Sequence, residues 1–256
     1  MAEVRQRWRL FVRRGEAGRE LAHREIEALW AEGLARAGVP VAMTEGARPR
    51  PRIAFAAPVP VGLTAEREPI DLFLAERLTI ADLRGRLLAA LPPGHELVDL
   101  HDVWTGEPSI AGRIVAADYR VDVGGVDRAE LEEAVSRLLA AGRLERPNRK
   151  GQAGRSYDLR PLIAELEVRP GRAPAAAPAP GAASAPDAAS APGAAPGAGL
   201  QLWMRLRHDQ ELGAGRPEEV LAALGAQLGR ELRTGLMTRE RLWLAGELSA
   251  EERDVG

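Results

Sequence analysis

Cysteine is absent from the 256-residue sequence, and only one of its 35 basic residues, Lys150, is a lysine. Without thiols the sequence cannot form a disulfide, a thiolate zinc site or a cysteine-ligated iron–sulfur cluster. It also lacks an apolar run of about 18 residues, the length that a membrane-spanning helix requires. The opening MAEVRQRWRLFVRRGE does not follow the pattern of a signal peptide. We therefore expect a cytoplasmic protein that has no membrane partner.

The overall composition is typical of a globular protein, but the charge is unevenly distributed. Hydrophobic residues make up 45% of the chain and charged residues 28%. The net charge is −2. Residues 1–60 contain 11 basic and 7 acidic residues, and residues 143–172 contain 8 basic and 4 acidic residues, so each zone has a net charge of +4. This layout favours a local anion-binding surface, although a general preference for arginine would produce the same counts.

Residues 170–199 consist almost entirely of proline, alanine, glycine and serine. Since this segment has no large side chain to bury, we expect a disordered, partly extended linker. The stretches on either side, AELEV and LQLWMRLR, have the apolar patterns of strands. The free-energy cost of closing a loop grows only logarithmically with its length, so the linker is compatible with a long hairpin loop inside one domain.

Periodicity in residues 1–108 predicts a βαββαβ order, which is the ferredoxin-like arrangement. Alternating apolar residues indicate strands, and apolar residues at three- and four-residue spacing indicate helices. Thr79, followed by Asp82 three residues later, is a typical start signal for the second helix. The expected elements are a strand at 8–14, a helix at 19–37, strands at 52–56 and 68–76, a helix at 79–91 and a strand at 95–104.

A second βαββαβ series follows in residues 109–256. Asp127 is its clearest helix-capping signal. We expect strands at 117–123, 143–149, 157–168 and 200–209, helices at 127–141 and 217–228, and a last strand near Leu242. The sequence therefore predicts an α+β fold of two tandem ferredoxin-like domains with antiparallel sheets. The predicted domains are residues 1–108 and residues 109–256, and the disordered linker at 170–199 interrupts the second.

Arginine and proline alternate at residues 48–52, between the first predicted helix and the second predicted strand. The fixed φ angles of Pro49 and Pro51 should stiffen this loop and hold the three guanidinium groups apart. Guanidinium groups match the geometry of phosphate and carboxylate groups. Glu45 and Gly46, just before this run, would supply a carboxylate and a turn. The alternative interpretation is a rigid, solvated connector. The residues of this loop are Glu45, Gly46, Arg48, Pro49, Arg50, Pro51 and Arg52.

Two further groups of residues are candidates for a site. Lys150 lies in a glycine-rich turn, where an ammonium group could meet a phosphate, or it is an ordinary surface base. His23, at the start of the first helix, could act as a general base or contact phosphate, or it could be structural. The four histidines lack the close spacing of a metal site, so we expect no metal and no other cofactor. The remaining basic candidates are Arg13, Arg14, Arg149, Arg155 and Arg160.

The stretch LAHREIEALWAEGLARAGVPVAMTEGARPRPRIAFAAPVPVG resembles the opening of the radical SAM-linked protein family, a bacterial group with a domain of unknown function. Members typically contain Leu-Ser-His-Leu-Asp at the start of a helix and a loop of the form Ser-Glu-Gly-Phe-Asn-Pro-Arg-Pro-Arg. The resemblance covers roughly residues 5–168 and, more weakly, 200–244, including the strings AADYRV and DLRPLIAELEV. It departs from the family at Ala22, Glu25, Ala47 and Arg48. The residues that match are His23, Glu45, Gly46, Pro49, Arg50, Pro51 and Arg52.

The resemblance implies a partner encoded beside, or fused to, this chain: a radical SAM protein, often near a ribonuclease of the E/G type. Because radical SAM chemistry requires three cysteines for its iron–sulfur cluster, this sequence can only be an accessory. We expect a non-catalytic accessory protein that binds an anionic substrate, such as structured RNA. The arginine loop would bind it, with help from Arg149, Lys150, Arg155 and Arg160.

Two alternatives remain open. The first is a metal-independent RNA-processing enzyme that uses His23, with Glu25 and Glu45 as candidate carboxylates. The second is a purely structural partner of the radical SAM protein, whose basic loop would contact an acidic protein surface.

Overall fold

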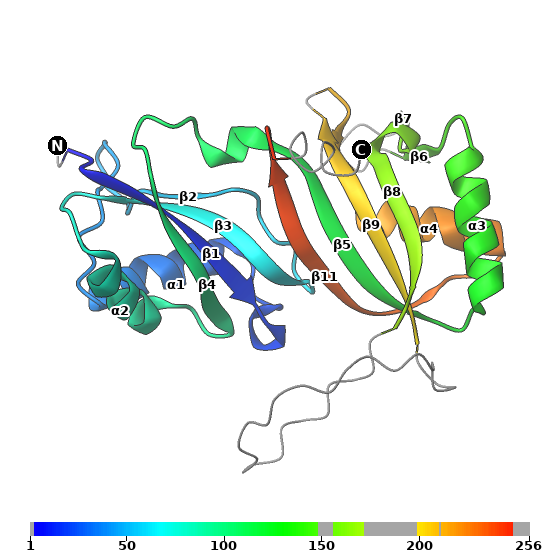
Figure 1. Cartoon of the computed structure of the whole chain (residues 1–256), viewed down its shortest axis with the longest axis horizontal. Coiled ribbons are helices and arrows are strands. Elements are labelled where there is room, and N and C mark those ends of the chain that lie inside the picture. Colours follow the sequence, from blue (N-terminus) through cyan, green and yellow to red (C-terminus); the bar gives the residue numbers. More distant parts are fainter. Residues whose placement is uncertain (1–2, 148–155, 172–198, 210, 248–256) are drawn as a thin grey trace, which may run out of the picture.

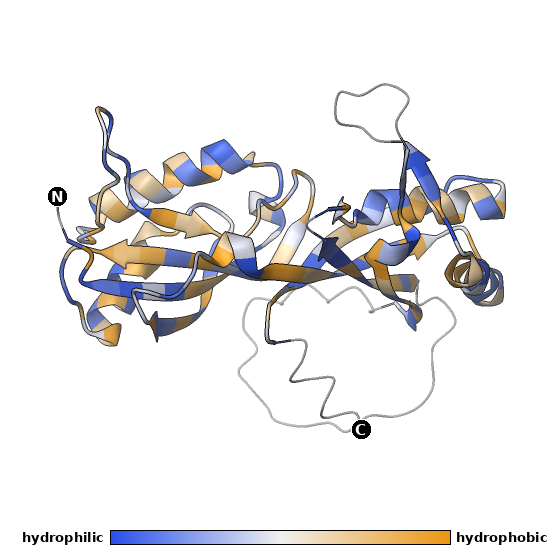
Figure 2. Ribbon diagram, turned by 90° about the horizontal axis from the view of Figure 1, so that it is seen from above, coloured by the Kyte–Doolittle hydropathy of each residue, from blue (hydrophilic) through white to orange (hydrophobic). Residues whose placement is uncertain are grey.

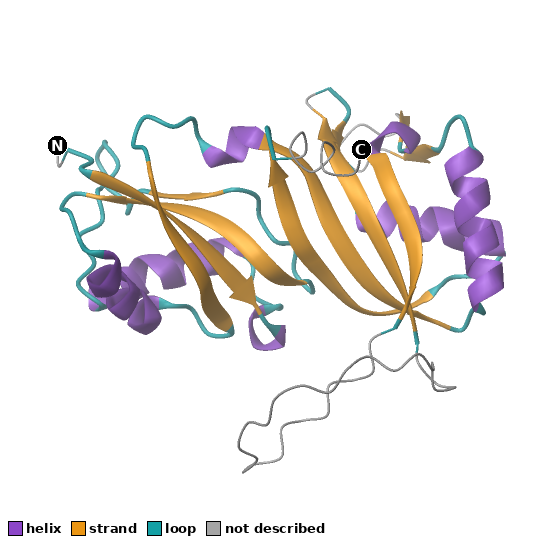
Figure 3. Ribbon diagram, in the orientation of Figure 1, coloured by secondary structure: helices purple, strands orange, loops and turns teal. Residues whose placement is uncertain are grey.

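The computed structural model describes residues 3–147, 156–171, 199–209 and 211–247. It has an α+β fold with a mostly antiparallel sheet, as the sequence predicts. Figure 3 shows the helices packed beside the strands in both halves of the molecule. The helices are α1 (His23–Arg36), α2 (Ile80–Ala90), α3 (Arg128–Ala140) and α4 (Pro217–Leu228), with short 3-10 turns η1 (Glu16–Gly18), η2 (Ile110–Arg113) and η3 (Arg160–Leu162).

Four strands of the first half form one antiparallel array. They are β1 (Gln6–Arg14), β2 (Ile53–Phe55), β3 (Thr64–Leu74) and β4 (His95–Val103), in the spatial order β4-β1-β3-β2. With α1 and α2 connecting them, this is the βαββαβ topology that the periodicity predicts. Trp8, Leu10 and Val12 alternate along β1 and are buried with Trp30 and Leu34 of α1.

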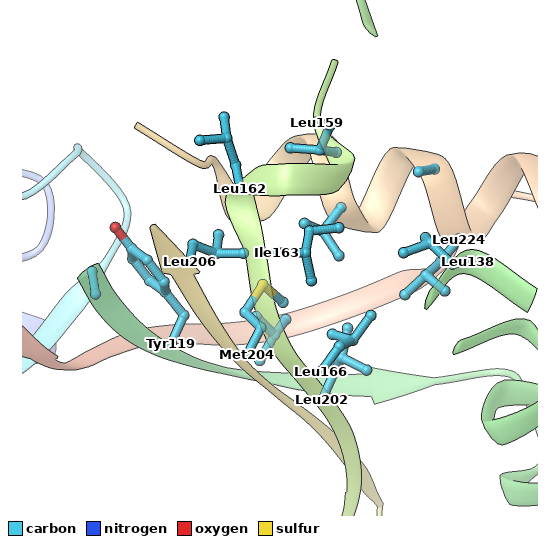
Figure 4. Packing of buried hydrophobic residues seen from close by; sticks show 14 of the residues in the cluster. Tyr119, Leu138, Leu159, Leu162, Ile163, Leu166, Leu202, Met204, Leu206 and Leu224 are labelled. Carbon is cyan, nitrogen blue, oxygen red and sulfur yellow. The ribbon is translucent and has the colours of Figure 1, made fainter. Parts of the chain in front are cut away.

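The second half repeats this order with β5 (Ile114–Gly124), β8 (Ile163–Pro170), β9 (Leu200–Asp209) and β11 (Arg233–Leu244). Their spatial order is β11-β5-β9-β8, and α3 and α4 connect them. Figure 4 shows their core, in which Leu166 of β8 and Leu202 of β9 pack among other buried side chains. The additional short strands are β6 (Glu145–Pro147), β7 (Ser156–Asp158) and β10 (Gly213–Ala214).

Strands β8 and β9 flank the linker and pair antiparallel, with Val168 opposite Leu202 and Pro170 opposite Leu200. The backbone N–H of Gly171 donates to the carbonyl of Gly199 at the end of this ladder. The prediction that the linker connects two strands of one hairpin is therefore confirmed. The predicted disorder of the linker concerns residues that lie outside the described part of the chain.

A single parallel contact joins the two halves of the sheet. Strand β11 pairs with β3 through Thr238 opposite Thr64 and Arg239 opposite Ala65. The hydroxyl groups of Thr64 and Thr238 lie 2.9 Å apart. Figure 1 shows β11 and β3 meeting at the centre of the molecule, with β4 and β2 on one side and β9 and β8 on the other. The predicted division at residue 108 falls in the connection between β4 and η2.

Several element boundaries differ from the sequence prediction by one to four residues, and for two of them the reason is identifiable. The first helix begins at His23 and not at residue 19, because the carbonyls of Gly18, Arg19 and Leu21 accept hydrogen bonds from the Arg14 guanidinium. The strand predicted at 68–76 is β3, which starts at residue 64 because its first residues pair with β11.

The strands predicted at 143–149 and 157–168 are also divided differently. Within the part of the chain that the structure describes, strands β6 and β7 pair only with each other, as a separate two-stranded sheet. The carboxylate of Asp158 accepts hydrogen bonds from the backbone N–H groups of Leu144 and Arg160. These bonds stabilise a change of chain direction at the start of η3, so β8 begins only at Ile163.

Candidate functional site

Residues 43–51 form a narrow hairpin that projects from the first half of the molecule, at the left of Figure 2. The backbone N–H of Thr44 donates to the carbonyl of Arg50 over 2.8 Å, and the N–H of Arg50 donates to the hydroxyl of Thr44 over 3.0 Å. The N–H of Arg52 donates to the carbonyl of Ala42 at the base. Gly46 lies at φ +118°, a conformation that favours glycine. Hydrogen bonds and prolines therefore hold this exposed segment in one shape.

The three arginines of this loop are exposed, and none forms an ion pair within the described residues. Arg52 is positioned by a ring: its guanidinium carbon lies 4.3 Å from the centroid of Phe73 on β3. Arg5 and Arg77, which flank β1 and β3 at the same end of the sheet, are also exposed and unpaired among the described residues. These arginines form no ion pair within the described residues, although the carboxylates of Glu3 and Glu76 are also exposed at this end of the sheet.

Glu45 lies exposed near the tip of the same hairpin, and its carboxylate has no hydrogen bond or ion pair with another described residue. Pro49 is exposed, and Pro51 pairs with Met43 across the hairpin base. The structure thus places Glu45, Gly46 and the two prolines in one short segment together with Arg48 and Arg50. Gly46 and Pro51 contribute to the shape of this loop, whereas Glu45 makes no contact with a described residue that would do so, and the arginines outnumber the single carboxylate.

Of the second predicted group of basic residues the structure describes only Arg160, which does not join this loop. Arg160 is half-buried, and its guanidinium donates to the carbonyls of Leu139 and Ile163, over 3.0 and 3.1 Å. These bonds fix η3 against the end of α3, so Arg160 has a structural role. Figure 1 places β7, which precedes η3, at the opposite end of the molecule from β2. The other members of the group, Arg149, Lys150 and Arg155, lie outside the described residues.

The expectation that Arg14 contacts phosphate is wrong. Its side chain is buried, and its guanidinium donates to four backbone carbonyls, including that of Val59 over 3.1 Å. Burial lowers the pKa of Arg14. The sequence could not distinguish it from its neighbour Arg13, which is exposed and lies 3.5 Å from Glu96.

A second buried arginine, which the sequence did not indicate, lies where the two halves meet. Arg239 donates through Nε and Nη2 to the two carboxylate oxygens of Glu68, over 2.7 and 2.5 Å. It also donates to the carbonyls of Ala57 and Pro58. Burial opposes the charge of Arg239, but the adjacent Glu68 carboxylate outweighs it and raises its pKa. Arg14 and Arg239 together therefore fix the segment that connects β2 to β3.

His23 lies at the first position of α1, beside a small pocket. The pocket has a volume of about 30 Å³, room for one water molecule, and is also lined by Arg14, Trp30 and His95. The ring of His23 meets the ring of Phe55 edge to face at 5.1 Å, and its Nε2 lies 3.4 Å from a carboxylate oxygen of Glu27. The pocket is therefore too small, in this conformation, for a substrate to enter.

The two carboxylates proposed as partners of His23 do not contact it: Glu25 caps a helix, and Glu45 lies on the hairpin of residues 43–51. Glu25 accepts a hydrogen bond from the backbone N–H of Ala22 over 2.7 Å, so it caps the start of α1. Neither Glu25 nor Glu45 contacts His23 in the described residues. The same part of the chain contains no group of three or more histidine, aspartate or glutamate side chains that could hold a metal ion.

The chain matches a bacterial protein family over residues 7–184. It belongs to the family described as "Uncharacterized protein conserved in bacteria (DUF2344)". A search of curated proteins finds no match. No helix in the described residues is long and apolar enough to span a membrane.

The solved structures that match this chain share little sequence with it. A Cbf5-Nop10-Gar1 complex matches with 9% identity and a TM-score of 0.46, over 91% of this chain and 48% of that chain. An unknown protein from Galdieria sulphuraria matches with 15% identity and a TM-score of 0.24, over 91% and 98% of the two chains. A Cas6 product complex matches with 16% identity and a TM-score of 0.23, over 91% and 99%. Similarities at this level carry no inference about function.

Proposed function

We propose that this protein is a non-catalytic accessory of a radical SAM enzyme, and that it binds an anionic substrate such as structured RNA. The observation that carries the proposal is the hairpin of residues 43–51 with its base at Arg52. It presents exposed guanidinium groups that no carboxylate neutralises within the described residues. Many other arginines of the chain contact a glutamate or aspartate, as Arg36, Arg128 and Arg137 do.

The chemistry of the loop suits a phosphate backbone. A guanidinium group offers up to five N–H donors in a planar fork and remains charged at all relevant pH values. Because hydrogen bonds hold the backbone that carries Arg48, Arg50 and Arg52, that backbone loses little conformational entropy on binding. Contacts of this kind position a nucleic acid without reading its sequence. They suit a protein that presents structured RNA to another enzyme.

The proposed link to a radical SAM enzyme rests on the sequence resemblance. The accessory role within that pair rests on the absence of cysteine from this sequence. The sequence contains no cysteine, so it cannot itself hold the iron–sulfur cluster on which radical SAM chemistry depends. An accessory role is consistent with this composition.

Co-purification with the radical SAM partner, followed by identification of any co-eluting nucleic acid, tests the proposal. We expect the wild-type complex to contain RNA. A variant with Arg48, Arg50 and Arg52 replaced by alanine should keep the partner and lose the RNA. A complex that is free of RNA would instead support a purely structural role for this chain.

A second candidate function, metal-independent RNA processing, is favoured by one observation. His23 is partly exposed at the start of α1, so its ring meets solvent in part even though the pocket beside it is too small for a substrate. Incubation of the purified protein with RNA tests this candidate directly. RNA cleavage that is lost in His23→Ala would establish it, and intact RNA with the wild-type protein would rule it out.

A further inference from the structure

The pocket beside His23 is bordered by a buried polar group that has no partner in the protein. Trp30 of α1 lines this pocket, and only 1% of its surface is exposed. Its indole Nε1–H has no hydrogen-bond acceptor within the described residues. Leaving a buried N–H group without an acceptor is costly, because the group gives up its hydrogen bond to water when the chain folds. The Trp30 ring therefore calls for an acceptor from outside the protein.

Arg14 lines the same pocket and also keeps one donor free. A guanidinium group has five N–H donors. Arg14 is buried and makes four hydrogen bonds, all to backbone carbonyls, with Nη1 bonding only to that of Val59. One N–H group on Nη1 therefore has no partner within the described residues.

His95 supplies a complementary acceptor. Its Nδ1 lies 3.0 Å from the carbonyl oxygen of Pro93, and since a carbonyl only accepts, Nδ1 bears the proton. Burial lowers the pKa of His95, so the ring is neutral near pH 7 and Nε2 has a lone pair. This nitrogen forms no hydrogen bond with a described residue. The half-buried imidazole thus presents an unused acceptor.

The three side chains converge on one small space. A Cβ atom placed on Gly18 would lie 3.2 Å from Cε1 of His95 and 3.4 Å from Cγ of Arg14, so these two side chains lie together against Gly18. Both line the pocket with Trp30, and its volume is about 30 Å³. A water molecule requires a cavity of at least about 10–15 Å³ and two to four polar partners. The pocket meets both requirements.

Other ligands fit this pocket less well. Its volume is too small for an organic molecule. The carboxylate of Glu68 also lines it, where it pairs with Arg239, and the Nε2 lone pair of His95 adds a second repulsive group for an anion. A water molecule can accept two hydrogen bonds and donate two, which matches two donors beside one acceptor.

We propose that this pocket is a binding site for a single water molecule, which accepts hydrogen bonds from Nε1 of Trp30 and Nη1 of Arg14 and donates one to Nε2 of His95. The water joins α1 to the end of β1 and to the start of β4, and so completes the polar contacts at this end of the first half. This inference does not depend on RNA binding.

Nuclear Overhauser spectroscopy of the isotope-labelled full chain tests this inference. A long-lived water beside an indole gives a cross-peak between water and the indole Hε1 proton, and its sign in the rotating frame distinguishes contact from proton exchange. We expect a contact cross-peak for Trp30, assigned by its disappearance in W30F. Trp8 is the internal comparison, because its Nε1 is also buried without a partner but does not line this pocket. We expect no cross-peak for Trp8.

Three variants locate the water. V12I adds a methyl group to the pocket wall and should remove the Trp30 cross-peak. V121I is the matched control, since Val121 is buried in the core of the second half and does not line the pocket; the cross-peak should be unchanged. H95F removes the acceptor and should also remove the cross-peak. Thermal melting of each variant checks that the fold is retained.

The wild-type spectrum alone can overturn the inference. A Trp30 Hε1 proton without a cross-peak to water, or with one that arises only from exchange, would show that no water is bound there. An unchanged cross-peak in folded V12I would place the water outside the pocket. An unchanged cross-peak in folded H95F would remove His95 as its acceptor. Either of these last two results would also contradict the proposed site.

Discussion

Glu68 and Arg239 lie buried between β3 and β11, where the carboxylate and the guanidinium form two hydrogen bonds. Replacing Glu68 by alanine would leave a buried, unpaired cation, a change that typically costs about 3–5 kcal/mol of stability. Urea unfolding of E68A measures this loss. The matched control is E66A, since Glu66 is 43% exposed and pairs with Arg120; we expect a loss below about 1 kcal/mol. Equal losses in the two variants would contradict this assignment.

Burial lowers the pKa of His95 and of His208 below the usual 6.5, and both rings are half-buried. The unfolded chain therefore binds more protons than the folded chain as the pH falls below about 6.5. The contribution of these histidines to stability is complete above that pH and is lost as the pH falls through their folded-state pKa values.

We accordingly expect a lower free energy of unfolding at about pH 5 than at about pH 7.5. Asp99, whose hydrogen bond from His101 lowers its pKa to about 2, has a usual value of 3.8 and so titrates below this window. Urea unfolding at the two pH values, for the wild type and for a variant with His95 and His208 replaced by asparagine, measures the effect. An equal pH difference in both proteins would exclude the histidines as its cause.

The arginines show where reading residues from the sequence reaches its limit. The sequence identified the alternating arginine-proline run, and the structure places it on an exposed hairpin. The same reasoning placed Arg14 and Arg160 on the surface, whereas both bind backbone carbonyls. The sequence does not distinguish an exposed arginine from one that binds backbone carbonyls. The role of an arginine depends on which carbonyls and carboxylates the fold brings near its guanidinium group. The sequence likewise does not indicate that Trp104 is exposed, since the exposure of a side chain follows from tertiary structure.

At the scale of elements, Gly33 in α1 lies against the end of α2. A Cβ atom at Gly33 would lie 2.1 Å from the carbonyl oxygen of Ala90, which is backbone and cannot move aside. We expect G33A to destabilise the protein by about 1–3 kcal/mol, because the two helices must separate. Gly85 of α2 has no atom within 4 Å of its Cβ position, so G85A should stabilise the helix by about 0.5–1 kcal/mol. Thermal melting of both variants should show shifts of opposite sign.

Local signals predicted most of the helices and strands. Thr79 accepts a hydrogen bond from the N–H of Asp82, and Asp127 accepts one from Glu130, as their positions in the sequence suggest. The strand alternation at Trp8, Leu10 and Val12 also matches the burial in β1. The sequence did not predict the separate sheet of β6 and β7. This sheet depends on the carboxylate of Asp158, which accepts hydrogen bonds from the backbone N–H groups of Leu144 and Arg160.

At the scale of the whole molecule, the tandem order followed from periodicity, but the junction of the halves did not. Only Thr64 and Ala65 of β3 pair with β11, and their partners lie more than 170 positions away in sequence. No local pattern indicates so short a parallel contact. The junction also contains the Arg239 ion pair and two carbonyl contacts, which stabilise it through residues on both sides.

Binding of purified protein to bulk tRNA over a salt series tests the central claim most directly. Each phosphate contact contributes about 0.7–0.9 to the slope of log K against log salt. We expect the variant with Arg48, Arg50 and Arg52 changed to alanine to lose affinity and to reduce the slope by about 2–3. The control replaces Arg36, Arg137 and Arg143, which are exposed but paired with glutamates, and removes the same charge. Equal behaviour of the two triple variants, or no tRNA binding by the wild type, would contradict the account.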